Sequence, residues 1–226
     1  MRDSYLRFFS EGYISKEQFF EFGLKETIYA PADKAAMEWN HLKQRITSDE
    51  TVYIRGFGRD ANGTYLFQEL YKGLLGNQNV QKDSTNNDKP TKLIRDLTGY
   101  SKIKSAKHRP IRNYQVSHIF GRTKNVYAFT APWNIVYMPK ILDPFTGHEA
   151  KGDIIDEYTL LFQKQSYERF SSLIDDFNKI ISANTFQEKL KHTLGLLAEN
   201  ATYSNEDINK LTKAINDEFK PIEIPR

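Results

Sequence analysis

The sequence predicts an α+β protein that is mainly helical and contains one small antiparallel pair of strands. Three observations support this fold class. Apolar side chains recur at helical spacing in the first 46 residues and again beyond Asp153. Residues 111–139 are typical of two strands joined by an irregular loop, and a minor strand is expected over 51–58. With 226 residues, the chain suits one large or two small domains and can bury a sizeable core.

Two helices are expected near the N-terminus. Ser15 and Gln18 stand at the spacing of a capping box, ahead of an aromatic run, and Gly23 follows where the helix is expected to stop. Pro31 is expected to open a second helix, which runs to Arg45.

After the strand at 51–58, the three- and four-residue spacing of leucines in residues 64–75 favours a helix over a returning strand. The chain then turns polar from Gly76 to Lys89, which predicts a loop or linker. We therefore divide the chain into an N-terminal helical/αβ region at 1–76, a linker at 77–89, a basic helix with a central core at 90–183, and C-terminal helices at 184–226.

The remaining helices follow from local signals. Residues 90–99 are expected to form a short basic helix. Asp143 followed by Pro144 is typical of a helix N-terminus, so a helix is expected to begin there. Two more helices are predicted near 185–199 and 204–219, the second one capped by Ser204.

Composition excludes several classes of protein. The chain has no cysteine, which excludes disulfides, thiol catalysis and a zinc site built on cysteine. No apolar run is long enough to span a bilayer, and charged residues interrupt the N-terminus before a signal-peptide core can form. We therefore expect a cytoplasmic protein that does not bind membranes.

Positive charge is concentrated in one stretch. Ten Lys and Arg lie between Lys89 and Lys124 against a single acid, Asp96, although the net charge of the whole chain is only +3. Ordinary protein surfaces intersperse both signs, so this stretch favours a polyanionic partner such as nucleic acid. The candidate nucleic-acid-binding residues are Lys92, Arg95, Lys104, Lys107, Arg109, Arg112, Arg122 and Lys124.

Three polar residues follow this stretch at suggestive intervals. His118 ends a strand-like run, Asn134 comes sixteen residues later, just before a second strand, and His148 follows fourteen residues after that. Residues of these types can surround one divalent cation. Each also has a structural reading: a lone strand histidine is more often not catalytic, and Asn134 beside Pro132 and Trp133 is typical of a turn. Trp133 itself is expected in the core.

The order strand, His, loop, Asn, strand, helix, His resembles the ββα-metal (HNH) endonuclease superfamily, over about 40 residues. The resemblance implies a ββα-metal core in which His118 is the general base that activates water and Asn134 orients it. It also implies that His148 is a ligand of a single Mg²⁺ or Mn²⁺, with Asp143 as a further ligand and Glu149 as a substitute.

One position departs from the family pattern. Members often carry an Asp or His immediately before the base as a metal ligand, and this chain has Ser117, a poor ligand for a divalent ion. Asp143, Glu149 or Asp153 is then needed to complete the metal shell. Arg122, four residues after the base, has a planar guanidinium that suits a scissile phosphate, or is simply one of the exposed basic residues.

The sequence thus favours a metal-dependent endonuclease that hydrolyses phosphodiester bonds in double-stranded DNA, most like a restriction enzyme. Cutting a palindrome would imply a homodimer, with the C-terminal helices as a candidate interface. Two alternatives stay open: a non-catalytic nucleic-acid-binding protein that uses the same basic stretch, and an RNA-cleaving nuclease or toxin. Phosphate contacts do not separate DNA from RNA.

Overall fold

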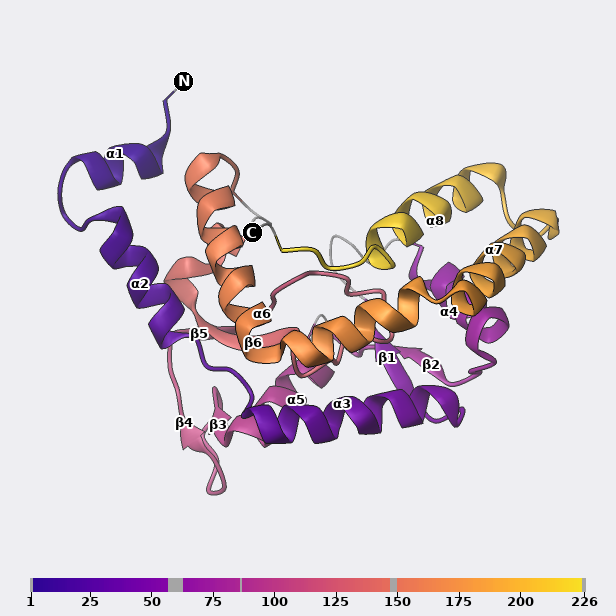
Figure 1. Cartoon of the computed structure of the whole chain (residues 1–226). Coiled ribbons are helices and arrows are strands. Elements are labelled where there is room, and N and C mark those ends of the chain that lie inside the picture. Colours follow the sequence, from indigo (N-terminus) through magenta and orange to yellow (C-terminus); the bar gives the residue numbers. More distant parts are fainter. Residues whose placement is uncertain (1, 57–62, 86, 147–149, 225–226) are drawn as a thin grey trace.

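The computed structural model describes residues 2–56, 63–85, 87–146 and 150–224 (Figure 1). Most of this chain is helical. The helices are α1 (Ser4–Ser10), α2 (Lys16–Glu26), α3 (Ala32–Thr47), α4 (Thr64–Leu75), α5 (Asp88–Thr98), the 3-10 helix η1 (Lys140–Thr146), α6 (Asp153–Ser182), α7 (Asn184–Glu199) and α8 (Asn205–Glu218).

The strands in this part of the chain are short and form three separate two-stranded sheets. β1 (Val52–Ile54) pairs in parallel with β2 (Val80–Lys82), and β3 (Tyr100–Ser101) pairs in parallel with β4 (Arg109–Pro110). β5 (Tyr114–His118) and β6 (Ile135–Pro139) form an antiparallel pair. The predicted α+β class, mainly helical with one antiparallel pair at 111–139, is confirmed.

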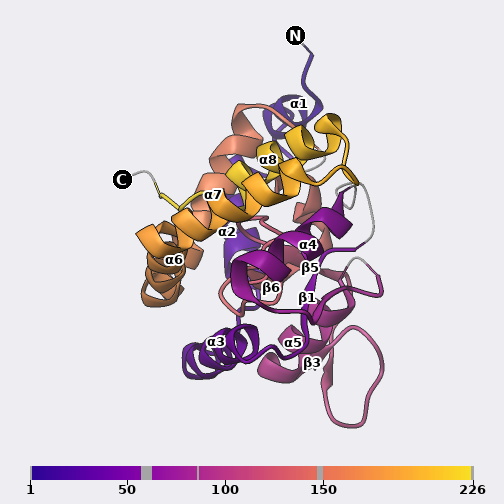
Figure 2. The ribbon, with the colours of Figure 1, turned by 90° about the vertical axis from the view of Figure 1, so that its right-hand side faces the viewer.

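The antiparallel pair lies in the middle of the molecule, with α6 on one side and α3 and α5 on the other (Figures 1 and 2). Tyr114 pairs with Pro139 at one end and His118 with Ile135 at the other. Every residue of β6 is buried, which explains why its sequence is a continuous apolar run rather than an alternating one. Ile28 and Tyr137 exchange two backbone hydrogen bonds, so the outer edge of β6 is also partly covered.

Trp133 belongs to the core, as predicted. It is 0% exposed, and its ring centroid lies 5.8 Å from that of Trp39 on α3 and 5.1 Å from that of Phe177 on α6. The three rings join α3, the β5–β6 connection and the second half of α6 into one apolar cluster. α6 bends at Phe170, whose backbone is not helical. The bend separates this half of α6 from the first half, where Tyr158 packs on Phe20 of α2.

The local helix signals are largely confirmed. Ser15 and Gln18 make both hydrogen bonds of a capping box at the start of α2, Pro31 precedes α3, and residues 64–75 form α4. The two C-terminal helices match α7 and α8, and the Ser204 hydroxyl accepts a hydrogen bond from the Asp207 N–H.

Gly23 does not stop α2, which continues to Glu26. Its role is close packing instead. A Cβ at this position would lie 2.5 Å from the Tyr158 hydroxyl oxygen and 2.9 Å from Leu142 Cγ. A glycine is therefore required at position 23 because neighbouring side chains leave no room for a Cβ, and not because the helix ends there.

The polar segment 77–89 is not entirely a loop. Val80 to Lys82 form β2, and Asp83, which is fully buried, accepts hydrogen bonds from the backbone N–H groups of Thr85, Asp88 and Lys89. Asp83 thereby stabilises the N-terminus of α5, where four N–H groups have no partner within the helix.

The prediction that a helix begins at Asp143–Pro144 is wrong. Residues 140–146 form η1, and the long helix α6 starts only at Asp153. The reason lies in the use of the Asp143 carboxylate, which accepts a hydrogen bond from the Gln115 side chain of β5 instead of capping a helix N-terminus.

Replacing Gly23 by alanine tests the close approach between α2 and α6. We expect Gly23→Ala to lower the free energy of unfolding by about 1–3 kcal/mol, because the added methyl group overlaps Tyr158 and Leu142. Gly195→Ala is the matched control: it lies in α7 with no atom near its Cβ, so it is expected to stabilise the protein by up to about 1 kcal/mol. Urea unfolding of both variants measures the difference, and equal effects would contradict the packing argument.

Candidate functional site

His118 lies at the end of β5 with its ring held from two sides. The ring stacks on that of Phe129, at 5.3 Å between centroids and 12° between planes, and its Nε2 is 2.9 Å from the Phe129 carbonyl oxygen. A carbonyl oxygen can only accept, so Nε2 carries the hydrogen and donates it. In the neutral ring the lone pair is then on Nδ1. The side chain is 7% exposed.

Asn134 holds the connection between β5 and β6 in shape. Its Oδ1 accepts a hydrogen bond from the Phe120 N–H at 2.9 Å, and its Nδ2 donates to the carbonyl oxygens of Gly121 (2.9 Å) and Ala128 (3.0 Å). The side chain is 0% exposed. These bonds join the start of the connection to its middle, directly before Phe129. Asn134 therefore holds the backbone next to the carbonyl oxygen that accepts the His118 hydrogen bond, and this geometry fits both a turn role and an orienting role for Asn134.

Asn125 is a second brace in the same connection, and sequence reasoning missed it. Its Oδ1 accepts from the Tyr127 N–H, and its Nδ2 donates to the Glu218 carbonyl oxygen at the end of α8. An asparagine that bonds its own backbone two residues on is a common turn signal. No local pattern indicates the partner 93 residues away.

The C-terminal segment, residues 219–224, crosses this connection and is attached to it by Arg122. The guanidinium donates to the carbonyl oxygens of Phe120, Lys220 and Pro221. On the other side, Asn178 of α6 exchanges two hydrogen bonds with the backbone of Ile222. Binding of the scissile phosphate by Arg122 stays a prediction. The contacts that the structure describes for Arg122 hold the C-terminal segment against the β5–β6 connection.

Glu218 is the most perturbed acid near the connection. Its Oε2 accepts a hydrogen bond from the Lys124 N–H at 3.1 Å. Burial raises the pKa of the Glu218 carboxyl to about 7, against the opposing effects of that hydrogen bond and of the nearby Lys124 and Arg122 charges. Glu218 also lines a polar hollow of about 460 Å³, together with Phe120, Gln163 and Glu223.

The residues proposed to hold a metal are not brought together within the described chain. His148 and Glu149 lie outside the described residues. Asp143 is bonded to Gln115, and because side chains alternate along a strand, Gln115 and Ser117 point to the face of β5 opposite His118. No group of three or more His, Asp or Glu residues in the described part of the chain could hold a metal ion. A metal site beside His118 would therefore need His148 or Glu149.

The basic stretch is divided by the structure into paired and unpaired cations. On α5, Lys92 lies 2.9 Å from Asp88 and Arg95 lies 2.8 Å from Asp96. α5 begins at Asp88, one residue before the basic stretch of residues 89–124. The net positive charge of α5 is therefore lower than the composition of that stretch indicates. Lys124 is half-buried, with its Nζ 5.6 Å from the centre of the Phe67 ring.

The exposed cations lie further along, in the loop between β3 and β4 and just after it. Among residues that the structure describes, no carboxylate lies within 4 Å of the side-chain nitrogens of Lys104, Lys107, Arg109 or Arg112. The strongest positive surface is therefore narrower than the sequence indicated, and it leads directly into the start of β5.

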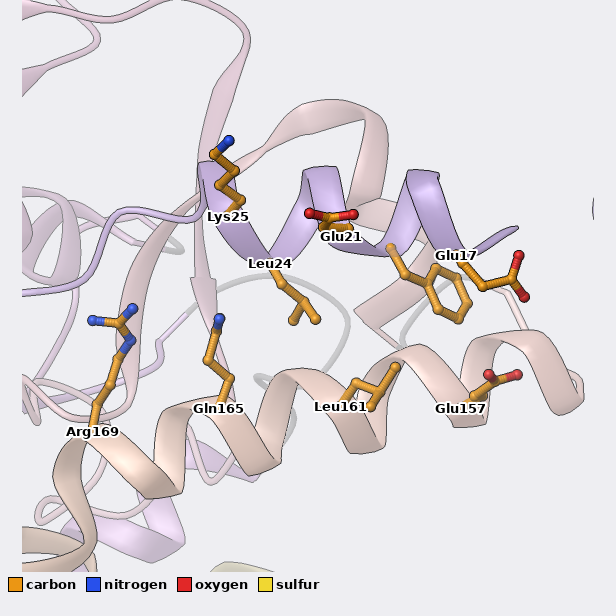
Figure 3. Close-up of a pocket in the computed structure, with 9 residues that line it drawn as sticks. Glu17, Glu21, Leu24, Lys25, Glu157, Leu161, Gln165 and Arg169 are labelled. Carbon is orange, nitrogen blue, oxygen red and sulfur yellow. The ribbon is translucent and has the colours of Figure 1, made fainter. Parts of the chain in front are cut away.

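A separate groove of about 650 Å³ runs between α2 and α6 (Figure 3). Glu17 and Glu157 lie at one end of the groove and Lys25 and Arg169 at the other, with Glu21, Leu24 and Leu161 between them, as Figure 3 shows. None of the residues singled out from the sequence lines this groove.

Comparison with known proteins places the chain in a family. A family model described as "Uncharacterised protein PM1201" matches residues 30–224. A Pasteurella multocida (strain Pm70) protein named "Uncharacterized protein PM1201" is 42% identical over 223 residues, which cover 98% of each chain. The chain belongs to this family. No solved structure matches the chain.

The family assignment covers β1 to β6 and the long helix α6, so the site around His118 lies inside the matched region, whereas α1 and α2 precede it. The matching names assign no chemistry to the family. Within the described residues, no helix is both long enough and apolar enough to cross a bilayer.

Removing the Asn134 side chain tests whether it holds the β5–β6 connection. Asn134→Ala leaves one buried N–H and two carbonyl oxygens without their partner, and we expect it to lower the free energy of unfolding by roughly 2–4 kcal/mol. Asn209→Ala, at an exposed position of α8, is the control and is expected to change stability by less than about 0.5 kcal/mol. Chemical denaturation compares the two, and a near-neutral Asn134→Ala would show that the connection does not depend on it.

Replacing Glu218 by glutamine tests the burial of its carboxyl. The folded-state pKa of about 7 lies above the ordinary value of 4.5, so the ionised carboxyl destabilises the fold above pH 4.5, and this penalty is complete above pH 7. We expect Glu218→Gln to match the wild type at pH 4 and to be more stable by up to about 3 kcal/mol above pH 7, at 1.36 kcal/mol per pKa unit. Thermal or urea unfolding from pH 4 to 8 measures this difference, and a difference that does not change with pH would refute the assignment.

Proposed function

We propose that this protein is a metal-dependent DNA endonuclease of the ββα-metal type, acting as a sequence-specific restriction enzyme. The observation that carries the proposal is the placement of His118 at the end of β5. Its ring is fixed by stacking on Phe129 and by the hydrogen bond from Nε2 to the Phe129 carbonyl oxygen. This arrangement supports general-base chemistry, because it presets one tautomer, with the lone pair on Nδ1, on a rigid strand.

The proposed reaction is hydrolysis of one phosphodiester bond. Nδ1 of His118 accepts a proton from a water molecule, whose oxygen attacks the phosphorus. The bond between phosphorus and the leaving oxygen breaks, and that oxygen takes a proton from solvent. Asn134 has a positioning role here, since it holds the backbone on which the His118 ring is oriented.

A divalent cation, Mg²⁺ or Mn²⁺, would supply charge neutralisation at the phosphate when bound. The candidate donors are His148 and Glu149, because the carboxylate of Asp143, the further ligand expected from the sequence, is bonded to Gln115 on the face of β5 opposite His118. The described residues alone do not form such a site, so the proposal places its metal ligands in the segment that includes His148.

The cations that have no carboxylate partner among the described residues support a polyanionic substrate, for which we propose double-stranded DNA. Arg109 and Arg112 precede β5, and His118 ends it, so one strand connects the positive surface to the proposed base. Lys and Arg side chains supply the sequence-independent part of DNA affinity by contacting phosphates. A palindromic target would call for a homodimer, which we also propose.

A second candidate is a non-catalytic nucleic-acid-binding protein. The observation that favours it is the low exposure of His118, 7%, because a general base must meet its water molecule. In that case the histidine is an internal support for the β5–β6 connection, and the positive surface alone carries the function.

Incubation of the purified protein with plasmid and phage DNA tests the proposal. Discrete fragments are expected with Mg²⁺ or Mn²⁺ and none with a chelator. His118→Ala and His118→Gln are both expected to reduce cleavage by about 10²-fold or more. The glutamine variant retains an N–H that can reach the Phe129 carbonyl oxygen, so it separates loss of the base from loss of the hydrogen bond. His41→Ala, at an exposed histidine of α3, is the control and is expected to cut normally.

The contrary results are distinct. Absence of cleavage by the wild type with every metal, together with salt-sensitive DNA binding, would support the second candidate. Cleavage of RNA but not DNA would reassign the substrate and leave the base in place.

A further inference from the structure

The loop between β3 and β4, residues 102–108, leaves the body of the molecule and returns to it. Its ends are held together by the β3–β4 pairing and by two backbone hydrogen bonds, from Arg109 N to the Gly99 carbonyl oxygen and from Ile111 N to the Ser101 carbonyl oxygen. In both Figure 1 and Figure 2 this loop projects beyond the helices around it. A short loop with closed ends is a compact surface feature rather than a linker.

Two serines order the loop, Ser101 at the end of β3 and Ser105 within the loop. The Ser101 hydroxyl accepts a hydrogen bond from the Ile103 N–H at 3.1 Å and donates to the Ile103 carbonyl oxygen at 2.8 Å. The Ser105 hydroxyl accepts from the Lys107 N–H and lies 3.1 Å from His108 Nδ1. The backbone at Ile103 is thus bound on both sides, which presets the direction of its side chain.

That side chain points into solvent. Ile103 is 78% exposed, although burying an isoleucine is worth about 1.5–3 kcal/mol. An isolated apolar side chain on a mobile loop would need no explanation. Here two hydrogen bonds to Ser101 hold the backbone of Ile103 close to the end of β3, and the exposed isoleucine side chain adds nothing to the stability of the free protein.

Ile103 stands between two lysines in the chain, Lys102 and Lys104. The exposed basic side chains in and beside the loop are Lys102, Lys104, Lys107, Arg109, Arg112 and Lys140. In the part of the chain that the structure describes, none of them has a carboxylate within 4 Å, and Asp96, which lies 3.6 Å from His108 of the loop, is also bonded to Arg95. Partial burial and the neighbouring charge of Lys140 lower the pKa of Lys102, so this surface concentrates like charges that an anion would relieve.

We propose that the β3–β4 loop enters the minor groove of a DNA duplex, with Ile103 as a wedge against the base pairs. Lys102 and Lys104 flank the wedge and contact the phosphates on the two sides of the groove. The minor groove is about 6 Å wide, so its two phosphate rows lie close to a single inserted side chain. Apolar wedges of this kind unstack a base step and bend the duplex.

The inference rests on the proposed function for its substrate, and it adds how that substrate is held.

A lipid surface is the other partner that combined lysines and isoleucine could suit. The structure favours DNA because one inserted isoleucine offers a membrane little apolar area, and because Arg109 and Arg112 carry planar guanidiniums that match phosphate pairs. Anionic vesicles are therefore an arm of the test.

The test measures DNA binding and bending in the His118→Ala protein, which keeps the substrate intact. A 30-base-pair duplex with a fluorophore at each end reports bending by energy transfer, and anisotropy reports affinity at several salt concentrations. Ile103→Ser is expected to abolish the bend while leaving the salt dependence unchanged. Lys104→Ala is expected to weaken binding and lower the slope of log affinity against log salt by about one.

Two exposed residues on other helices serve as matched controls. Leu196→Ser on α7 removes an exposed apolar side chain, and Lys213→Ala on α8 removes an exposed cation, so both are expected to bind and bend DNA like the parent protein. Equal thermal midpoints for all variants exclude loss of folding.

The outcomes separate this inference from the proposed function. Bending that depends on Ile103 supports the wedge even if the wild type cuts no DNA. Bending and affinity that survive Ile103→Ser overturn it even if the wild type does cut. Absence of DNA binding, or pelleting with phosphatidylserine vesicles that depends on Ile103, also overturns it, and the latter result would make the loop a membrane contact.

Discussion

Three hydrogen bonds made by the buried side chain of Asn134 hold the connection between β5 and β6, and the candidate site depends on them. This connection contains little regular structure, yet it carries the carbonyl oxygen of Phe129 that orients His118. A buried backbone without secondary structure must satisfy its polar groups with side chains. Asn134 can do this because one amide supplies both donors and an acceptor, so a single residue serves an N–H and two carbonyl oxygens.

The C-terminal segment gives the connection its second support. Arg122, Asn125 and Asn178 all donate to backbone carbonyl oxygens at or beyond the end of α8. The support places the Glu218 carboxyl where burial raises its pKa to about 7. The region around His118 therefore depends on residues at the far end of the chain, and its electrostatics change near neutral pH.

The cations of the basic stretch differ in whether a carboxylate lies beside them. On α5 the cations have carboxylate partners, whereas the cations of the projecting loop have none within the described residues. The hydroxyl of Ser101 bonds to the backbone of Ile103. The Ile103 side chain and the neighbouring cations are exposed to solvent. Under the proposed function, a polyanion would therefore contact the loop rather than the whole basic stretch.

The sequence by itself determined what depends on neighbouring residues. The capping box at Ser15, the helix at 64–75, the antiparallel strands and the buried Trp133 all follow from spacing and hydrophobicity, because short-range patterns decide them. The positions of His118 and Asn134, at the end of one strand and just before the next, were predicted for the same reason.

Only the tertiary structure decided which partner each side chain uses. Gly23 faces Tyr158, Asp143 is bonded to Gln115, and Arg122 reaches Lys220, across separations of 28 residues or more. Gly23 was expected to stop a helix and makes a packing contact instead. Asp143 was expected to cap a helix and is bonded to a strand, and Arg122 supports the C-terminal segment. No local pattern encodes these pairings, since a hydrogen bond or a steric contact depends on position in space after the chain has folded.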